Sequence, residues 1–115
     1  MATPTDYEPK QLWAPLQVPA ADTLIYTSPG GQKGTRIQGL IIVNTSSAPV
    51  TIRITHGAMG EAQALCWDFS VPADGLPHDL MDGAKTILMD ASDVLRAEAA
   101  AAASLTLHGY GLEMN

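Results

Sequence analysis

The fold is decided by residues 22–54, whose sequence is DTLIYTSPGGQKGTRIQGLIIVNTSSAPVTIRI. Three runs rich in Val, Ile, Thr and Tyr stand at 23–28, 35–44 and 50–56, and these residue types favour β-strands. Pro-Gly-Gly separates the first two runs and Asn-Thr-Ser-Ser-Ala-Pro the last two, and both separators are typical of turns. Short strands in succession predict an all-β architecture, with Gly39 as a β-bulge in the second strand.

The alternation of side chains predicts which face of a strand is buried. Ile52 and Ile54 alternate with Arg53 and Thr55, so we expect the isoleucines to face the core and the other two to face solvent. In residues 40–43 the apolar side chains are consecutive, which predicts a segment covered on both sides. Both patterns are typical of strands that belong to packed sheets.

Turn residues punctuate the second half of the chain at spacings of roughly ten residues. Residues 64–71 have the pattern of a strand with Trp67 and Phe69 on one side, and we expect Trp67 to be internal. Further strands are expected at 76–81, 86–90 and 104–112, with a hairpin turn at residues 82–83. About seven to nine short strands predict a single antiparallel β-sandwich, jelly-roll-like, over residues 21–115.

Residues 93–103, DVLRAEAAAAA, allow two interpretations. The alanines and a preceding Ser-Asp cap favour a helix. On a helix, however, Glu98 would fall in the middle of the apolar face. On a strand, Glu98 shares the outer face with Arg96, and the residues that turn inward are Leu95, Ala97 and Ala99. We therefore expect a strand, a turn of small residues and a second strand.

The first 20 residues differ from the rest of the chain. They hold Pro4, Pro9, Pro15 and Pro19, half of the eight prolines. Proline blocks both a helix and a central strand, so we expect residues 1–20 to form an extended arm attached to the sandwich.

The arm also carries apolar side chains that a solvated tail does not need. The candidate interface residues are Tyr7, Leu12, Trp13, Leu16 and Val18. We expect the arm to dock, either on its own sandwich or on a neighbouring subunit. Trp13 is the candidate anchor, because a buried aromatic side chain dominates the energy of many interfaces; the alternative is that it forms a lid over its own core.

The composition excludes several classes of protein. The chain has 115 residues, of which 46% are hydrophobic and 16% charged, with a net charge of −6. Nucleic-acid-binding domains need a basic face, so we expect no direct nucleic acid. We also expect no membrane partner, because no apolar run is long enough for a span. The opening sequence MATPTDYEPK lacks the apolar run of a signal peptide.

The charge is unevenly divided between the two halves. Residues 1–60 carry a net +1 and residues 61–115 a net −7. Such a division indicates an acidic rim or a head-to-tail contact between unlike patches, unless loop aspartates simply fall in the second half.

No constellation of residues predicts catalysis or a cofactor. His56, His78 and His108 lack metal-ligand spacing, and the first and last are expected to be solvated. His78 with Asp79 and Asp82 could form an oxygen-rich site, but the spacing of a calcium loop is absent. No GxSxG turn supports a nucleophile. We therefore expect a non-enzymatic protein without catalytic, cofactor-binding or metal residues; a small metal protein that uses the histidines is the weighed alternative.

Cys66 is the single cysteine. It cannot form an internal disulfide, so we expect a small buried hydrophobic side chain in a chain that folds in a reducing compartment.

The strand and turn sequences resemble those of small virion proteins of tailed bacteriophages. The resemblance lies in residues 22–54 and in residues 93–113, DVLRAEAAAAASLTLHGYGLE, about half of the chain. The matching elements are a strand that ends in a Tyr-Thr-x-Pro turn, a strand that closes on Asn-Thr-Ser, a Thr-Ile-x-Ile strand and a late Gly-x-x-x-Glu, here Gly109 and Glu113.

This resemblance implies a β-sandwich that is present in many copies on the virion and has no catalytic residues. We expect a capsid decoration (cement) protein that binds the major capsid protein or other virion subunits, itself a homo-oligomer with a trimer favoured. The alternative is a neck, tail, tail-fibre or baseplate module, which could recognise a glycan on the host surface.

Overall fold

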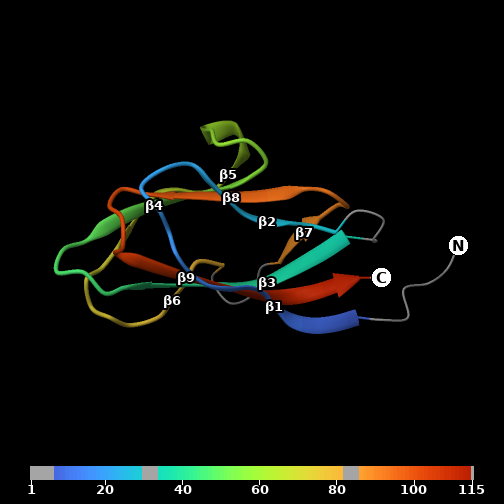
Figure 1. Ribbon diagram of the computed structural model, residues 1–115, viewed down its shortest axis with the longest axis horizontal. Coiled ribbons are helices and arrows are strands. Elements are labelled where there is room, and N and C mark those ends of the chain that lie inside the picture. The colour runs from blue at the N-terminus through green and yellow to red at the C-terminus, as the bar shows by residue number, and fades with distance from the viewer. Residues whose placement is uncertain (1–6, 30–33, 82–85, 115) are drawn as a thin grey trace, which may run out of the picture.

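The computed structural model describes residues 7–29, 34–81 and 86–114, and this part of the chain is all-β (Figure 1). In it, no helix is long and apolar enough to cross a membrane. One 3-10 turn, η1, spans Glu61–Gln63. The strands are β1 Tyr7–Gln17, β2 Thr23–Thr27, β3 Gly34–Asn44, β4 Val50–His56, β5 Ala64–Val71, β6 His78–Asp79, β7 Ile87–Met89, β8 Val94–Ala99 and β9 Leu105–Met114.

The strands form two antiparallel sheets that pack as a sandwich. Sheet A has the order β1-β9-β3-β6, with β7 also paired to β3, and sheet B has the order β2-β8-β4-β5. Figure 1 shows the two sheets as an upper and a lower layer. The pairs β1–β9, β2–β8, β3–β6/β7 and β4–β5 are those of one long ribbon folded at the β4–β5 connection and then rolled up. The predicted jelly-roll-like sandwich is therefore confirmed.

The core lies between the sheets and follows the predicted alternation. Ile52 and Ile54 of β4 are fully buried, as predicted. Each buried aliphatic side chain of this size contributes about 1.5–3 kcal/mol of hydrophobic stabilisation. The largest fully buried apolar side chains come from strands of both sheets and, for Val18, from the residue after β1; they are Ile37, Ile42, Ile52, Ile54, Met89, Leu95, Leu105, Leu107, Val18 and Val71.

The alanine-rich segment is a strand followed by a turn, as predicted. β8 ends at Ala99, and the chain turns through Ala103, which has a positive φ of 56°, before β9 begins. Leu95, Ala97 and Ala99 face inward and are buried. Their packing between two neighbouring strands outweighs the helix propensity of alanine.

β3 contains the predicted bulge. Gly39 and Leu40 pair with consecutive residues of β9, whereas the pairing skips a β3 residue between Ile37 and Gly39. A Cβ at Gly39 would lie 2.1 Å from the Tyr110 ring, so a larger residue here would require this exposed ring to move away.

The prediction that residues 40–43 are covered on both sides is wrong. Leu40 and Ile42 are buried, but Ile41 and Val43 are partly exposed on the outer face of sheet A. Only the inner face of β3 meets another layer, so its burial alternates.

Two further predictions need correction. Thr55 is buried rather than solvent-facing, because the β4–β5 pairing is irregular next to it, and its hydroxyl donates a hydrogen bond to the Gly57 carbonyl (3.2 Å). The strand expected at 76–81 is only His78–Asp79. The Pro-Gly-Gly turn after Pro29 and the Asp82-Gly83 hairpin lie outside the described residues.

Candidate interaction surfaces

The predicted arm is, over residues 7–17, the edge strand β1 of the chain's own sheet A. It pairs with β9 from Tyr7↔Met114 to Gln17↔Thr106, with irregular register around Trp13. Proline is tolerated in an edge strand because the outward-facing N–H needs no partner in the sheet. Of the two alternatives for the arm, the structure therefore shows the first: residues 7–17 dock on the chain's own sandwich.

Trp13 fixes this strand to the sandwich. Its indole Nε1–H donates a hydrogen bond to the Leu107 carbonyl (3.2 Å), and its ring lies 6.0 Å from that of Tyr26, measured between ring centroids. A Cβ at Gly109 would lie 2.2 Å from the indole, so Gly109 makes room for it. The side chain thus lies over its own core, which was the alternative to an anchor for another subunit.

The other predicted arm residues divide by exposure. Leu12 and Val18 are buried in the core, and Leu16 is partly exposed. The side chain of Tyr7 lies outside the described residues. An interface between these residues and another subunit stays a prediction.

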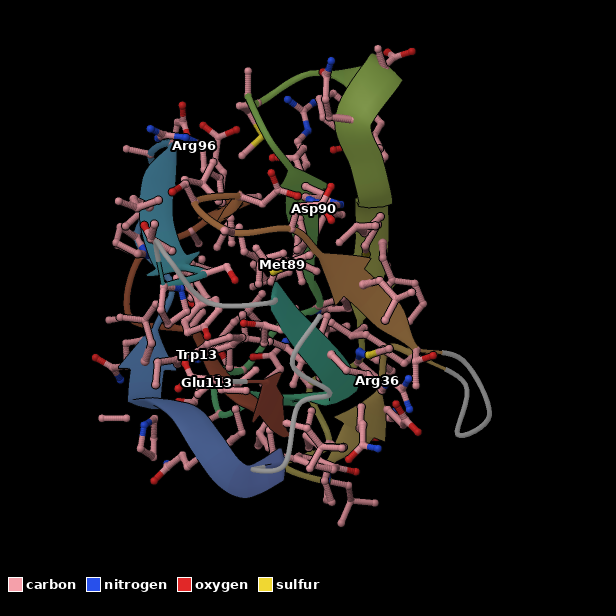
Figure 2. The ribbon with its side chains drawn as sticks, turned by 90° about the vertical axis from the view of Figure 1, so that its right-hand side faces the viewer. Trp13, Arg36, Met89, Asp90, Arg96 and Glu113 are labelled. Carbon is pink, nitrogen blue, oxygen red and sulfur yellow. The ribbon has the colours of Figure 1, made fainter. Side chains whose placement is uncertain are left out.

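A polar cluster that the sequence analysis did not predict joins the two sheets. The Tyr26 hydroxyl of sheet B donates to the Glu113 carboxylate of sheet A and lies 3.0 Å from the Thr35 hydroxyl. The Ser28 hydroxyl lies 2.9 Å from the same Thr35 oxygen. Trp13 and Glu113, both labelled in Figure 2, contact Tyr26 from sheet A, Trp13 through its ring and Glu113 through its carboxylate.

The cluster keeps the Tyr26 hydroxyl neutral. Burial and the neighbouring Glu113 carboxylate raise the pKa of Tyr26 from 10.0 to about 12. Tyr26 and Glu113 belong to two of the sequence elements that carry the phage resemblance, and here their role is structural.

The outer face of sheet B carries a network of ion pairs between residues of the same chain. The Arg53 Nε–H donates to the Asp68 Oδ1 at 2.5 Å, and its guanidinium lies 3.8 Å from the Glu98 carboxylate. The same guanidinium stacks over Trp67, 4.2 Å from the ring centroid. Close by, Arg96 binds Asp22 at 3.2 Å. These pairs satisfy the charges of this face within the chain.

The prediction that Trp67 is internal is wrong. Asp68 has a positive φ of 54°, and the register of β4–β5 shifts between Ile52 and Ile54. The resulting bulge breaks the alternation of β5 and leaves Trp67 partly exposed against Arg53.

The sandwich is open between the edge strands β5 and β6, which belong to different sheets. A hollow of about 620 Å³ runs along β5, and an adjoining one of about 240 Å³ reaches the core side chains Leu40 and Met81. Leu65, Cys66 and Leu80 line both hollows. Leu65 and Phe69 are 40% and 44% exposed, so this open edge presents apolar surface to solvent.

Cys66 is half-buried in this open edge rather than enclosed in the core. Burial raises the pKa of its thiol, which disfavours the reactive thiolate. The prediction of a buried hydrophobic side chain is therefore only partly correct, because Cys66 packs against the core on one side and borders the hollow on the other.

Two of the three histidines each bind one carboxylate. The His56 Nε2 lies 2.9 Å from the Asp93 Oδ2, and the His78 Nε2 lies 3.0 Å from the Asp74 Oδ2. His108 lies on the outer face of sheet A, across from Ile41. Among the described residues, no group of three His, Cys, Asp or Glu side chains could hold a metal ion; Asp82, which the calcium alternative invoked, lies outside them.

The fold and these surfaces define a class of protein, a jelly-roll β-sandwich with exposed apolar faces. Comparisons with known proteins add no family to this description: no family model, no curated protein and no solved structure matches the chain.

Proposed function

We propose that the chain is a non-enzymatic structural protein of a tailed-phage particle, a capsid decoration protein that binds the head shell and stabilises it. The observation that carries the proposal is that large apolar side chains are exposed to solvent on a small sandwich whose two sheets are held together by specific contacts. Monomeric proteins rarely leave large contiguous apolar patches exposed, and such patches mark interaction sites. Among the described residues, Leu65 and Phe69 gather at one hollow beside β5, and the other exposed large apolar side chains are Leu24, Leu76, Leu88 and Tyr110.

The architecture suits a protein that bridges shell subunits. A cement protein works only if internal pressure must break its contacts before its own fold deforms. Here β1 is held to β9 along its length, and Tyr26 links the two sheets through Glu113. The body can therefore transmit force between the subunits that it contacts.

The open edge beside β5 is the surface that we assign to the shell contact. Leu12, Trp13 and Val18 already pack on this chain's own sandwich, so the arm contributes through its exposed edge rather than through these side chains. β5 offers eight residues of edge strand beside the hollow that Leu65 and Phe69 border. An unpaired edge strand is a template for pairing with a partner's strand.

Binding of purified protein to phage heads that lack it tests the proposal. We expect the wild type to bind saturably and the double variant L65S/F69S to lose at least tenfold in affinity, a loss equivalent to about 1.4 kcal/mol. L24S is the matched control, because Leu24 is similarly exposed, at 48%, but lies on β2, at the opposite edge of sheet B from β5. Wild-type protein that does not bind would overturn the proposal, and undiminished binding of the double variant would overturn the assignment to the open edge.

A second candidate function is a tail or fibre module that recognises a host-surface glycan. Three aromatic side chains favour it: Phe69 and Tyr110 are exposed, and Trp67 lies outside the core. Aromatic rings beside carboxylates such as Asp68 and Asp79 suit the apolar faces and hydroxyls of sugars. Binding of labelled protein to host cells or immobilised glycans, lost in F69S, would support this function over the decoration role.

A further inference from the structure

The outer face of sheet A carries exposed apolar side chains around one arginine. Arg36 on β3 lies across from Leu88 on β7 and from Leu112 on β9, so the three side chains share one face. Leu88 is 62% exposed, and Tyr110, one outward position before Leu112, is 48% exposed. No strand or loop in the described part of the chain covers this row.

Two charged residues near this face differ from the arginines of sheet B in their ion pairs. Arg53 and Arg96 each bind a carboxylate of their own chain, whereas Arg36 forms no ion pair with any described residue. Asp90 follows Leu88 by two positions, directly after the end of β7, and its exposed side chain likewise has no ion pair in the described part. Both residues are labelled in Figure 2; the register places Arg36 across from Leu88, the middle residue of β7, and Asp90 directly follows this strand.

We propose that the outer face of sheet A is a twofold interface with a second copy of this chain, in which Arg36 of one copy binds Asp90 of the other. A twofold contact uses the same patch on both copies, so that patch must be complementary to itself. A cation and an anion without an ion pair among the described residues, with the exposed Leu88 across from Arg36 and two positions before Asp90, meet this requirement. Arginine beside apolar residues is also the composition typical of interface cores.

The size of the face fits a reversible dimer. β3 has eleven residues, each with a rise of about 3.4 Å. Three neighbouring strands, about 4.8 Å apart, then give this face a flat area of roughly 500 Å². Protruding side chains such as Leu88 increase the accessible area toward the ~800 Å² per partner of a standard interface. We therefore expect a dimer that dissociates on dilution. This twofold pair replaces the trimer expected from the sequence as our proposal for self-association.

Sedimentation velocity of the purified full chain over a wide concentration range tests the proposal. We expect the wild type to shift from monomer to dimer as its concentration rises. L88S and R36E should each raise the dissociation constant at least tenfold, and L24S, at another exposed leucine, which lies on sheet B, should leave it unchanged. The charge reversal R36E/D90R should recover most of the loss, because it restores the pair with opposite signs. Far-UV circular dichroism confirms that each variant folds.

Four results would overturn the proposal: a wild type that stays monomeric at every concentration, a trimer, an equal effect of L24S and L88S, or a charge reversal without recovery. The measurement uses no phage particle, so its failure is distinguishable from failure of the proposed function.

Discussion

The Tyr26 hydroxyl of sheet B donates a hydrogen bond to the Glu113 carboxylate of sheet A, so a single contact joins the first strand of one sheet to the last strand of the other. The same hydroxyl contacts Thr35, and Trp13 packs beside the ring. Tyr26 and Glu113 are 87 positions apart in the sequence, and their contact joins the two sheets on the side of the sandwich where the edge strands β1 and β2 lie. Because three of its partners belong to sheet A, Tyr26 is the residue whose loss should loosen the two layers most.

Replacing Tyr26 with Phe should lower the free energy of unfolding by about 1–3 kcal/mol, because the Glu113 and Thr35 oxygens lose a buried donor or acceptor. Urea denaturation at neutral pH measures the change. Y110F is the matched control, since Tyr110 is 48% exposed, and it should leave stability unchanged. Equal effects of the two variants would show that the buried hydroxyl contributes nothing specific.

Stability should also fall in alkali. The pKa of Tyr26 is raised in the folded protein, so its contribution is fully present below pH 10 and is lost as the pH rises from 10.0 through about 12. Urea midpoints across this pH range should decline for the wild type. The Y26F variant, which has no hydroxyl to titrate, should decline less, and parallel curves for the two proteins would contradict this account.

Trp13 and Gly109 should be coupled in stability. W13A removes a half-buried ring and its hydrogen bond to Leu107, and should cost about 2–3 kcal/mol, below the range for a fully buried Trp. G109A should cost about 1–3 kcal/mol, because its Cβ would overlap the indole. In the W13A background the added methyl meets no ring, so the double variant should be more stable than the sum of the single effects predicts. A double-mutant cycle in urea checks this, and strict additivity would exclude the contact.

Acid should weaken the surface pairs of sheet B and its turns. Hydrogen bonds from Arg53 and His56 lower the pKa of Asp68 and of Asp93, respectively. Depressed carboxylate pKa values give stability that is present above the ordinary value of 3.8 and is lost as the pH falls through the lower folded values. Thermal melts below pH 4 should therefore show a wild-type decline that D68N/D93N lacks. Because these groups are exposed, added salt should reduce the difference.

The strands could be predicted from the sequence because their patterns are local. Alternation placed Ile52 and Ile54 in the core, and the position of Glu98 identified 93–103 as strand and turn despite its alanines. What could not be predicted depends on backbone detail or on distant partners. The positive φ of Asp68, which turns Trp67 out of the core, has no signature in the apolar spacing.

The candidate sites likewise divide into features that local patterns predict and features that depend on distant parts of the chain. The apolar residues of the arm indicated that it docks, but only the pairing of β1 with β9 shows that it docks on its own chain. The open edge beside β5 depends on which strands end each sheet, and the apolar neighbours of Arg36, which has no ion pair among the described residues, depend on the strand order. Exposed Leu88 and Phe69 follow the same strand patterns as buried residues, so their exposure required the fold.

Electron cryomicroscopy of phage particles assembled in host cells that produce the chain with a C-terminal label tests the central claim most directly. We predict many symmetry-related copies of a small two-layered β density on the outer surface of the head, with the β5 edge against shell subunits. Copies confined to the tail or fibres would favour the glycan-binding alternative over the decoration role. A particle that contains no copy of the chain would contradict the proposal that it is a virion structural protein.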